Sequence, residues 1–370
     1  RGLGDVYKRQ ANIWFHDHIL GMTRLNVYAG IAGAYVLTDP GATHPDLGAV
    51  TDLVPLVIQD RTFDTNGQLW FGDGGATPEH PYWIPEFIGD VIVVNGAAWP
   101  TMKVEPKRYR FLFLNGSNAR GYDIFNVIPA QANAPGPDIF VIGTDGGYLD
   151  YPAKVDYSGA GEKLVLLPGE RYEVIIDFTG FGGTFIEMRN SAGTPYPLGD
   201  PVTPGGTDTI MQFEVKGKPK SPGIVYDPAV PMPAPLRTDP IIRLDGLTPT
   251  VTRQLTLNEV DGILAPREAL LNNTKWHGKQ IWEGAGTTDP NDVGPRDQND
   301  FTLVNYNGIP TYYSEMPAEG SMEVWEIINI TADAHPIHLH LVQFQLLGRQ
   351  PIDDLQYLAA YESLFPGAMY

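Results

Sequence analysis

The stretch Arg108–Asn118, RYRFLFLNGSN, decides the fold class of this chain. Every second side chain from Tyr109 to Phe113 would point to one face of a β-strand, and the side chains between them to the other, because a strand has a period of two. The Asn-Gly pair that follows is a turn signal that ends the strand. The stretch therefore predicts a β-strand with alternating faces.

Similar short segments recur along the chain, and turn residues separate them at intervals of about 8–12 residues. They are ANIWFHDHILG (11–21), NVYAGIAGAYVLTD (26–39), DLVPLVIQDRTFD (52–64), IFVIGTDGGYL (139–149), YEVIIDF (172–178) and MEVWEIINI (322–330). Helical periodicity is scarce, and only LAPREALLNN (264–273) predicts a short helix. The pattern is typical of an all-β protein made of sandwiches or barrels.

Composition excludes several classes of partner. The net charge of −19 argues against nucleic acid and against anionic membrane surfaces, since both attract clustered Lys and Arg. No run of about 18 apolar residues is present, so no transmembrane helix is predicted. The 41 glycines and 33 prolines are spread along the chain, as expected of many turns.

The 370 residues are enough for two or three domains. Proline-rich and turn-rich stretches predict the boundaries: a C-terminal remnant of a first domain at 11–45, a complete second domain at 50–215, a proline-rich linker at 216–244, and a third domain at 245–370 that is incomplete at its C-terminal end. Residues 1–10, RGLGDVYKRQ, have no periodicity and are predicted to be a non-native or disordered leader. Turns of similar character precede RYRFLFLN and EVWEIINI, which suggests an internal repeat.

Two histidine clusters carry the chemistry of the chain. Five of its eight histidines lie in His16-Asp17-His18 and in His335-Pro336-Ile337-His338-Leu339-His340. On a strand, residues i and i+2 share a face, so His16 would project with His18, and His338 with His340. Imidazole ligands suit copper, zinc, iron or nickel rather than calcium or magnesium. Two such pairs could hold more than one metal ion.

The remaining candidates receive plainer interpretations. His335 lies three residues before His338, across a proline, and could serve a separate metal centre. Asp17 is expected to face solvent or to support a ligand. The isolated histidines His44, His80 and His277 are expected at the surface. The Asp-Gly-Gly at 145–147 is expected to be a turn and not a catalytic site.

WFHDHILGMTRLNVYAGIAGAYVL (14–37) and DAHPIHLHLVQFQLLGRQPID (333–353) resemble two copper motifs of the multicopper oxidases. The intervening PEFIGDVIVVNGAAWP, VEPKRYRFLFLNGSNAR, IGTDGGYL and LLPGERYEVIIDF also resemble that family. The most similar branch is the bacterial group of the spore-coat laccase, bilirubin oxidase and phenoxazinone synthase. The resemblance covers nearly all of residues 11–355. It implies tandem cupredoxin-like Greek-key β-barrels, three in a whole protein, with the first and third truncated here.

The resemblance also implies a function. Members oxidise phenols, aromatic amines or bilirubin-like compounds one electron at a time at a type 1 copper, and reduce dioxygen to water at a cluster of type 2 and type 3 copper. Carried over by position, His335 matches a type 1 ligand, His338 a type 2 ligand, and His16, His18 and His340 match type 3 ligands. The implied partners are a small aromatic substrate and dioxygen, and the oligomeric state is not indicated.

The chain departs from the family pattern in two places. It lacks the upstream His-x-His pair and the downstream His-Cys-His stretch, and with no cysteine it cannot supply the thiolate of a type 1 site. The resemblance therefore predicts an oxidase parent and an inactive isolated segment. The eight methionines are not clustered, which disfavours oxidation of cuprous ion. An extracytoplasmic or spore-associated location would suit the family, but the chain carries no signal for either.

Two other functions are open. A copper-free relative could keep the cupredoxin fold for contacts with other proteins, but such a protein would have no reason to keep five matching ligands. A zinc hydrolase could use His16-Asp17-His18, but it would need further Asp or His ligands on a mixed α/β pattern, which the sequence lacks.

Overall fold

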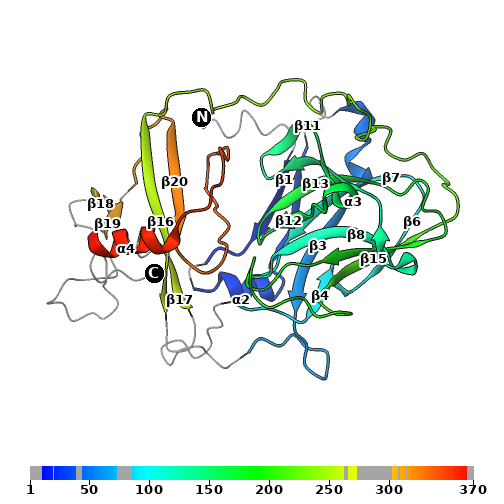
Figure 1. Cartoon of the computed structure of the whole chain (residues 1–370), viewed down its shortest axis with the longest axis horizontal. Helices are drawn as coiled ribbons and strands as arrows, with labels where there is room; N and C mark the ends of the chain where they lie inside the picture. Colours follow the sequence, from blue (N-terminus) through cyan, green and yellow to red (C-terminus); the bar gives the residue numbers. More distant parts are fainter. Residues whose placement is uncertain are drawn as a thin grey trace. The chain divides into compact units, whose positions relative to one another are not determined.

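The computed structural model describes residues 11–19, 21–38, 44–72, 86–261, 266–272, 302–306, 309–313 and 315–364. These residues form two compact units (Figure 1). The first unit contains the described residues of Arg1–Phe71, Glu86–Ile242 and His335–Phe344. The second contains those of Gly72–Pro85, Arg243–Ala334 and Gln345–Tyr370.

Two β-sheets that share one core make up most of the first unit. The larger sheet has the order β11-β10-β13-β7-β3-β4-β5, and its strands are β3 (Leu53–Arg61), β4 (Val91–Val94), β5 (Ala97–Ala98), β7 (Arg108–Asn115), β10 (Ile139–Thr144), β11 (Gly147–Val155) and β13 (Arg171–Asp177). The other sheet has the order β12-β8-β14-β15-β6 with β9 beside β8, and its strands are β6 (Thr101–Val104), β8 (Tyr122–Ile128), β9 (Ala134–Pro135), β12 (Leu164–Leu166), β14 (Phe185–Asn190) and β15 (Thr209–Val215).

A hairpin outside these sheets carries the first histidine cluster. It consists of the antiparallel strands β1 (Ala11–His16) and β2 (Ala32–Leu37), with helix α2 (Thr23–Tyr28) between them. The remaining short elements of the unit are α3 (Tyr157–Ala160), η1 (Pro45–Leu47), η2 (Val50–Asp52) and η3 (Pro129–Gln131).

The larger sheet is covered on both faces. Phe111 and Phe113 of β7 are fully buried in the core between the two sheets, where burying such a side chain contributes about 1.5–3 kcal/mol. A smaller core lies on the opposite face. It contains Ile142, Ile175 and Tyr148 of the sheet, Leu47 from the chain before the sheet, and residues from the chain after it. Part of that cover is the proline-rich segment 216–244, whose Ile224, Tyr226 and Leu236 are buried there.

The second unit is built on a three-stranded sheet of order β17-β16-β20, in which β16 and β20 are parallel. Its elements are β16 (Val251–Asp261), β17 (Pro266–Leu271), β18 (Thr302–Tyr306), β19 (Ile309–Tyr313), β20 (Glu323–Asn329) and α4 (Asp354–Leu364). Strands β18 and β19 pair as a separate hairpin. No helix among the described residues is long and apolar enough to cross a membrane.

The all-β prediction is confirmed, but the local predictions for the segments 264–273 and 26–39 are wrong. The described part of the segment 264–273, residues 266–272, does not form a helix, because strand β17 (Pro266–Leu271) pairs with β16 from Leu257 to Asp261, and this ladder outweighs helix propensity. The segment 26–39 is not one strand. Its first residues end α2, Gly30 follows at φ +109°, and the strand starts only at Ala32.

Candidate metal centre

Strand β1 places His16 at its C-terminal end, next to the larger sheet. The ring of Trp14, two residues earlier, lies 4.3 Å from the ring of His16, centroid to centroid. Trp14 also packs on the backbone of Gly169, where a Cβ atom would lie 3.3 Å from the indole and φ is +81°. A glycine is therefore needed there for the tryptophan to approach.

Asp17 organises the turn that follows β1. Its backbone N–H donates to Ile31 O at 3.1 Å, and its carboxylate Oδ2 accepts from Ile19 N at 3.3 Å and from Asn26 Nδ2 at 3.0 Å. Its carbonyl oxygen lies 2.7 Å from Nδ1 of His16. Since a carbonyl can only accept, Nδ1 carries the proton and Nε2 keeps the lone pair that a metal would need. Asp17 thus acts as a support for the histidines.

The second cluster lies on a segment that belongs to no strand, so the expectation of a strand at His338–His340 is wrong. The two rings nevertheless lie together, with centroids 4.9 Å apart. Directly after them Val342 N donates to His340 O at 2.9 Å across Leu341, whose φ is +68°. This is a γ-turn of the rare kind with positive φ, which is strained for a residue with a side chain.

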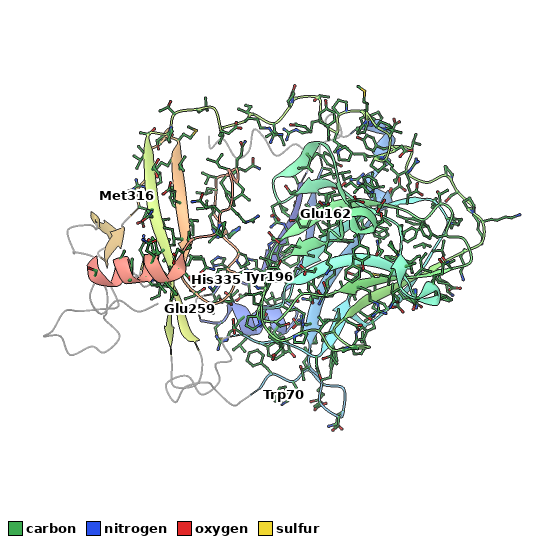
Figure 2. The ribbon with its side chains drawn as sticks, viewed as in Figure 1. Trp70, Glu162, Tyr196, Glu259, Met316 and His335 are labelled. Atoms are coloured by element: carbon green, nitrogen blue, oxygen red, sulfur yellow. The ribbon has the colours of Figure 1, made fainter. Side chains whose placement is uncertain are left out.

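The structure brings four of the five predicted histidines together. The ring centroids of His16 and His18 are 5.6 Å apart, and those of His18 and His340 are 5.2 Å apart. Together with the pair His338–His340, these contacts join both clusters into one group. His335 opens the second segment (Figure 2) and is half-buried, and its assignment to a separate centre stays a prediction.

The surroundings of His338 favour the neutral form of its ring. The pKa of His338 lies below its ordinary value because the ring is partly desolvated and because His340, Arg171 and His16 oppose a further positive charge. Asp145 acts in the opposite direction, but with a smaller effect. Neutral imidazole is the form that binds a metal, so this shift favours the form of His338 that can act as a ligand.

Two supporting residues escaped the sequence analysis. Arg171, the first residue of β13, forms an ion pair with Asp145 at 2.8 Å and donates to Asn12 O at 3.0 Å and to Gly169 O at 2.8 Å. Asp145 does lie in a turn, between β10 and β11, as predicted. Its carboxylate has the additional role of pairing with Arg171. The sequence feature that could have pointed to Arg171 is an arginine at the start of an otherwise apolar strand.

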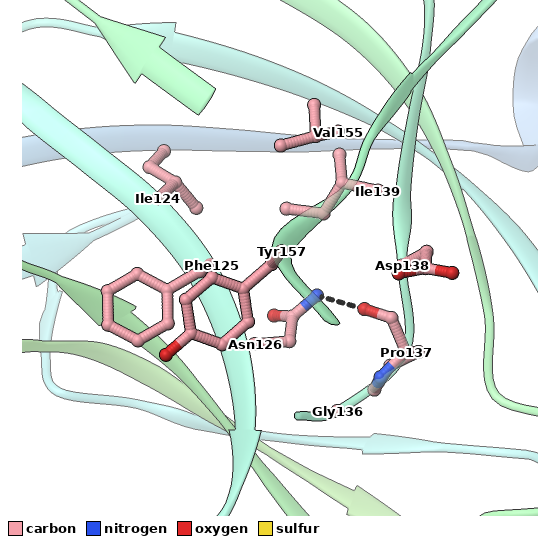
Figure 3. Close-up of a pocket in the computed structure, with 9 residues that line it drawn as sticks. All are labelled: Ile124, Phe125, Asn126, Gly136, Pro137, Asp138, Ile139, Val155 and Tyr157. Carbon is pink, nitrogen blue, oxygen red and sulfur yellow. Dashed lines mark hydrogen bonds between the residues drawn. The ribbon is translucent and has the colours of Figure 1, made fainter. Parts of the chain in front are cut away.

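The other isolated features do not join this site. His44 is half-buried, and its Nδ1 accepts from Asp46 N at the start of η1. His80 and His277 lie outside the described residues. A pocket beside the stacked rings of Phe125 and Tyr157 (Figure 3) is lined by none of the predicted ligands.

Comparison with known proteins agrees with the ligand chemistry. A sequence model described as multicopper oxidase matches residues 280–361, a range that includes the second cluster. The laccase of Bacillus subtilis is 34% identical over 364 residues, which are 97% of this chain and 60% of that laccase. The chain belongs to the multicopper oxidase family. This confirms the predicted family.

Further relatives support the same conclusion. The multicopper oxidase LPR1 of Arabidopsis thaliana is 31% identical over 92% of this chain and 50% of its own length. The crystal structure of the McoA multicopper oxidase of Aquifex aeolicus aligns with a TM-score of 0.63 and 26% identity, over 94% of this chain and 65% of that one. The cupredoxin-like fold class is thereby confirmed. The chain spans about 60% of the length of the Bacillus subtilis laccase.

Proposed function

We propose that this chain contributes copper ligands to a laccase-like oxidase. The substrates would be phenols, aromatic amines or bilirubin-like compounds, oxidised one electron at a time, with dioxygen as the acceptor that becomes water. The observation that carries the proposal is the group of four imidazoles from two segments far apart in the sequence, with neighbouring ring centroids 4.9–5.6 Å apart.

The donor set fits copper. Soft or borderline redox metals prefer imidazole nitrogen, and the lowered pKa of His338 keeps that ring in its binding form. His338 would hold a type 2 copper, and His16, His18 and His340 would hold type 3 copper. His335 would serve a type 1 copper. When bound, copper would supply one-electron redox chemistry and the reduction of dioxygen.

The residues of the chain would bind and orient the metals. The carbonyl of Asp17 fixes the tautomer of His16, and the indole of Trp14 limits the rotation of that ring. The chain offers no thiolate, because it contains no cysteine. We therefore propose that the chain alone binds copper but does not turn over substrate.

The rival functions explain the geometry less well. A copper-free structural relative would not need four converging imidazoles. In a zinc hydrolase that used His16-Asp17-His18, the carboxylate would have to act at the metal. The carboxylate of Asp17 instead accepts from Ile19 N and Asn26 Nδ2.

Copper binding tests the proposal. Purified metal-free chain is titrated with Cu²⁺ and with Zn²⁺ by calorimetry, and bound metal is counted after dialysis. The variants H16A/H18A and H338A/H340A should each lose most of the bound copper, whereas H44A should bind as the wild type does. Equal copper binding by all three variants would reject the assignment.

Activity is tested separately. The flanking segments of the Bacillus subtilis laccase are joined to this chain so that the missing ligands are supplied. We expect the copper-loaded chimera to oxidise a phenolic substrate with consumption of dioxygen, and the H338A/H340A chimera to do so at background. A folded, copper-loaded chimera without oxidase activity would contradict the proposed reaction.

A further inference from the structure

Arg171 occupies a position that connects distant parts of the first unit. Its side chain is only 11% exposed, and its guanidinium reaches Asn12 O, Gly169 O and the carboxylate of Asp145 within 3.0 Å. Asn12 lies on β1, four residues before His16. One arginine therefore fixes the strand that carries the first histidine cluster to the turn that carries Asp145.

The turn of Asp145 supports the second cluster. Gln343, three residues after His340, donates from Nε2 to Gly146 O at 3.3 Å. Gly146 directly follows Asp145 in that turn. The carboxylate is itself held by two bonds from Arg171, one from the backbone N–H at 2.9 Å and one from the guanidinium at 2.8 Å.

The two histidine segments share no ladder within the part of the chain that the structure describes. Strand β1 ends at His16, and the segment around His338 belongs to no strand. Their alignment must then come from supports that both segments share. The chain of contacts from Asn12 through Arg171 and Asp145 to the segment of His338 and Gln343 is such a support.

We infer that Arg171 and Asp145 form a positioning pair that keeps His16 and His18 aligned with His338 and His340. This inference rests on the proposed function, in which these histidines bind copper together. An arginine is required because its planar fork can reach three acceptors in fixed directions, whereas a lysine ammonium is a single point of charge. Supports of this kind typically change metal affinity about 10- to 100-fold when removed.

The test compares R171K and D145N with a matched control in the full chain. Arg108→Lys is the control: Arg108 starts β7, a neighbour of β13 in the same sheet, and its ion pair with Asp177 at 3.0 Å lies outside these contacts. Copper affinity and the Cu²⁺ electron paramagnetic resonance spectrum are measured, together with thermal unfolding. We expect R171K and D145N to lose about 10-fold or more in affinity and to change the spectrum, and R108K to leave both unchanged.

A metal-free readout separates this inference from the proposed function. Nuclear Overhauser contacts between the ring protons of His18 and His340 should be present in the wild type and in R108K, and weak or absent in R171K. If the wild type bound no copper but R171K lost these contacts, the positioning pair would stand and the copper function would fall. If R171K and D145N kept the contacts, the affinity and the spectrum, or if R108K lost them equally, the inference would be overturned.

Discussion

Asn12 of β1 donates a hydrogen bond from Nδ2 to Oε2 of Glu173 in β13 at 3.0 Å, and both side chains are buried. The other carboxylate oxygen of Glu173 accepts from Arg110 Nε and from the hydroxyl of Tyr148. A small polar network, enclosed by the sheet and its outer cover, thus fixes the hairpin that carries His16. The hairpin is attached by directed bonds as well as by apolar contact.

Removing the charge of Glu173 should destabilise the first unit strongly. The substitution Glu173→Gln leaves the fully buried Arg110 without its counter-ion, which typically costs about 3–5 kcal/mol. Urea unfolding measures the loss. The double variant R110M/E173L is expected to be less destabilised than E173Q, since it removes both charges at once. If the double variant lost as much unfolding free energy as R110M and E173L lose in sum, the two charges would not be coupled.

Changes at Asn12 should affect the hairpin more than the rest of the unit. Asn12→Ala removes one hydrogen bond and should cost about 1 kcal/mol, because its Oδ1 has no hydrogen-bond partner to lose. Asn12→Asp should cost more, because it would place a second carboxylate against Glu173. Amide hydrogen exchange in β1 and β2 is the measurement. Faster exchange in N12A than in N12D would contradict this order.

The second unit should lose stability in acid through Glu323. Its carboxylate accepts from Arg253 Nε at 2.7 Å and Nη2 at 3.0 Å, and also from Trp325 Nε1, and these bonds lower its pKa. A carboxylate whose pKa is lower in the folded than in the unfolded state stabilises the fold at pH values above its unfolded-state pKa of about 4.3. This contribution disappears as the pH falls through the folded-state pKa.

The pH dependence of unfolding tests this assignment. Between neutral pH and about pH 3, the stability of the second unit should fall less in E323Q than in the wild type. Glu326→Gln, on the same strand but exposed, is the matched control and should follow the wild-type profile. Identical profiles for E323Q and the wild type would show that another group governs the acid response.

The γ-turn after His340 gives a prediction about backbone strain. Leu341 is 94% exposed, so its replacement loses almost no packing. Leu341→Gly should leave copper affinity unchanged or slightly higher, since glycine adopts positive φ without the cost of about 1–2 kcal/mol. Leu341→Val should weaken binding, because a β-branched residue resists that conformation. Equal affinities for L341G and L341V would mean that the turn does not position His340.

Much of the fold follows from local patterns. RYRFLFLN became β7 because a period of two holds whatever its partner is, and both of its faces proved to be buried. The suspected repeat also has a structural counterpart: β7 pairs in parallel with β3, and β20 pairs in parallel with β16. The helix expected at 264–273 failed because pairing with β16, a non-local contact, decided the conformation of β17.

In the candidate site too, local spacing predicted some features, and non-local contacts decided the rest. Spacing within each cluster predicted the pairs His16–His18 and His338–His340, and both pairs are present although only His16 lies on a strand. Spacing could not reveal Arg171, because its bond to Asn12 joins residues separated by 159 positions. Contacts of that kind depend on how the sheet and hairpin pack, which a single sequence does not encode in any local period.

The last prediction concerns the colour of the copper-loaded chain. Intense blue copper sites need a cysteine thiolate beside two histidines, and this chain has no cysteine. Copper bound through His16, His18, His338 and His340 should therefore give only weak visible absorption and no oxidase turnover. Absorption spectra are recorded during the copper titration, with H338A/H340A as the variant that should lose even the weak bands. An intense blue band from the unaltered chain would contradict the ligand assignment, since no residue in its sequence could produce it.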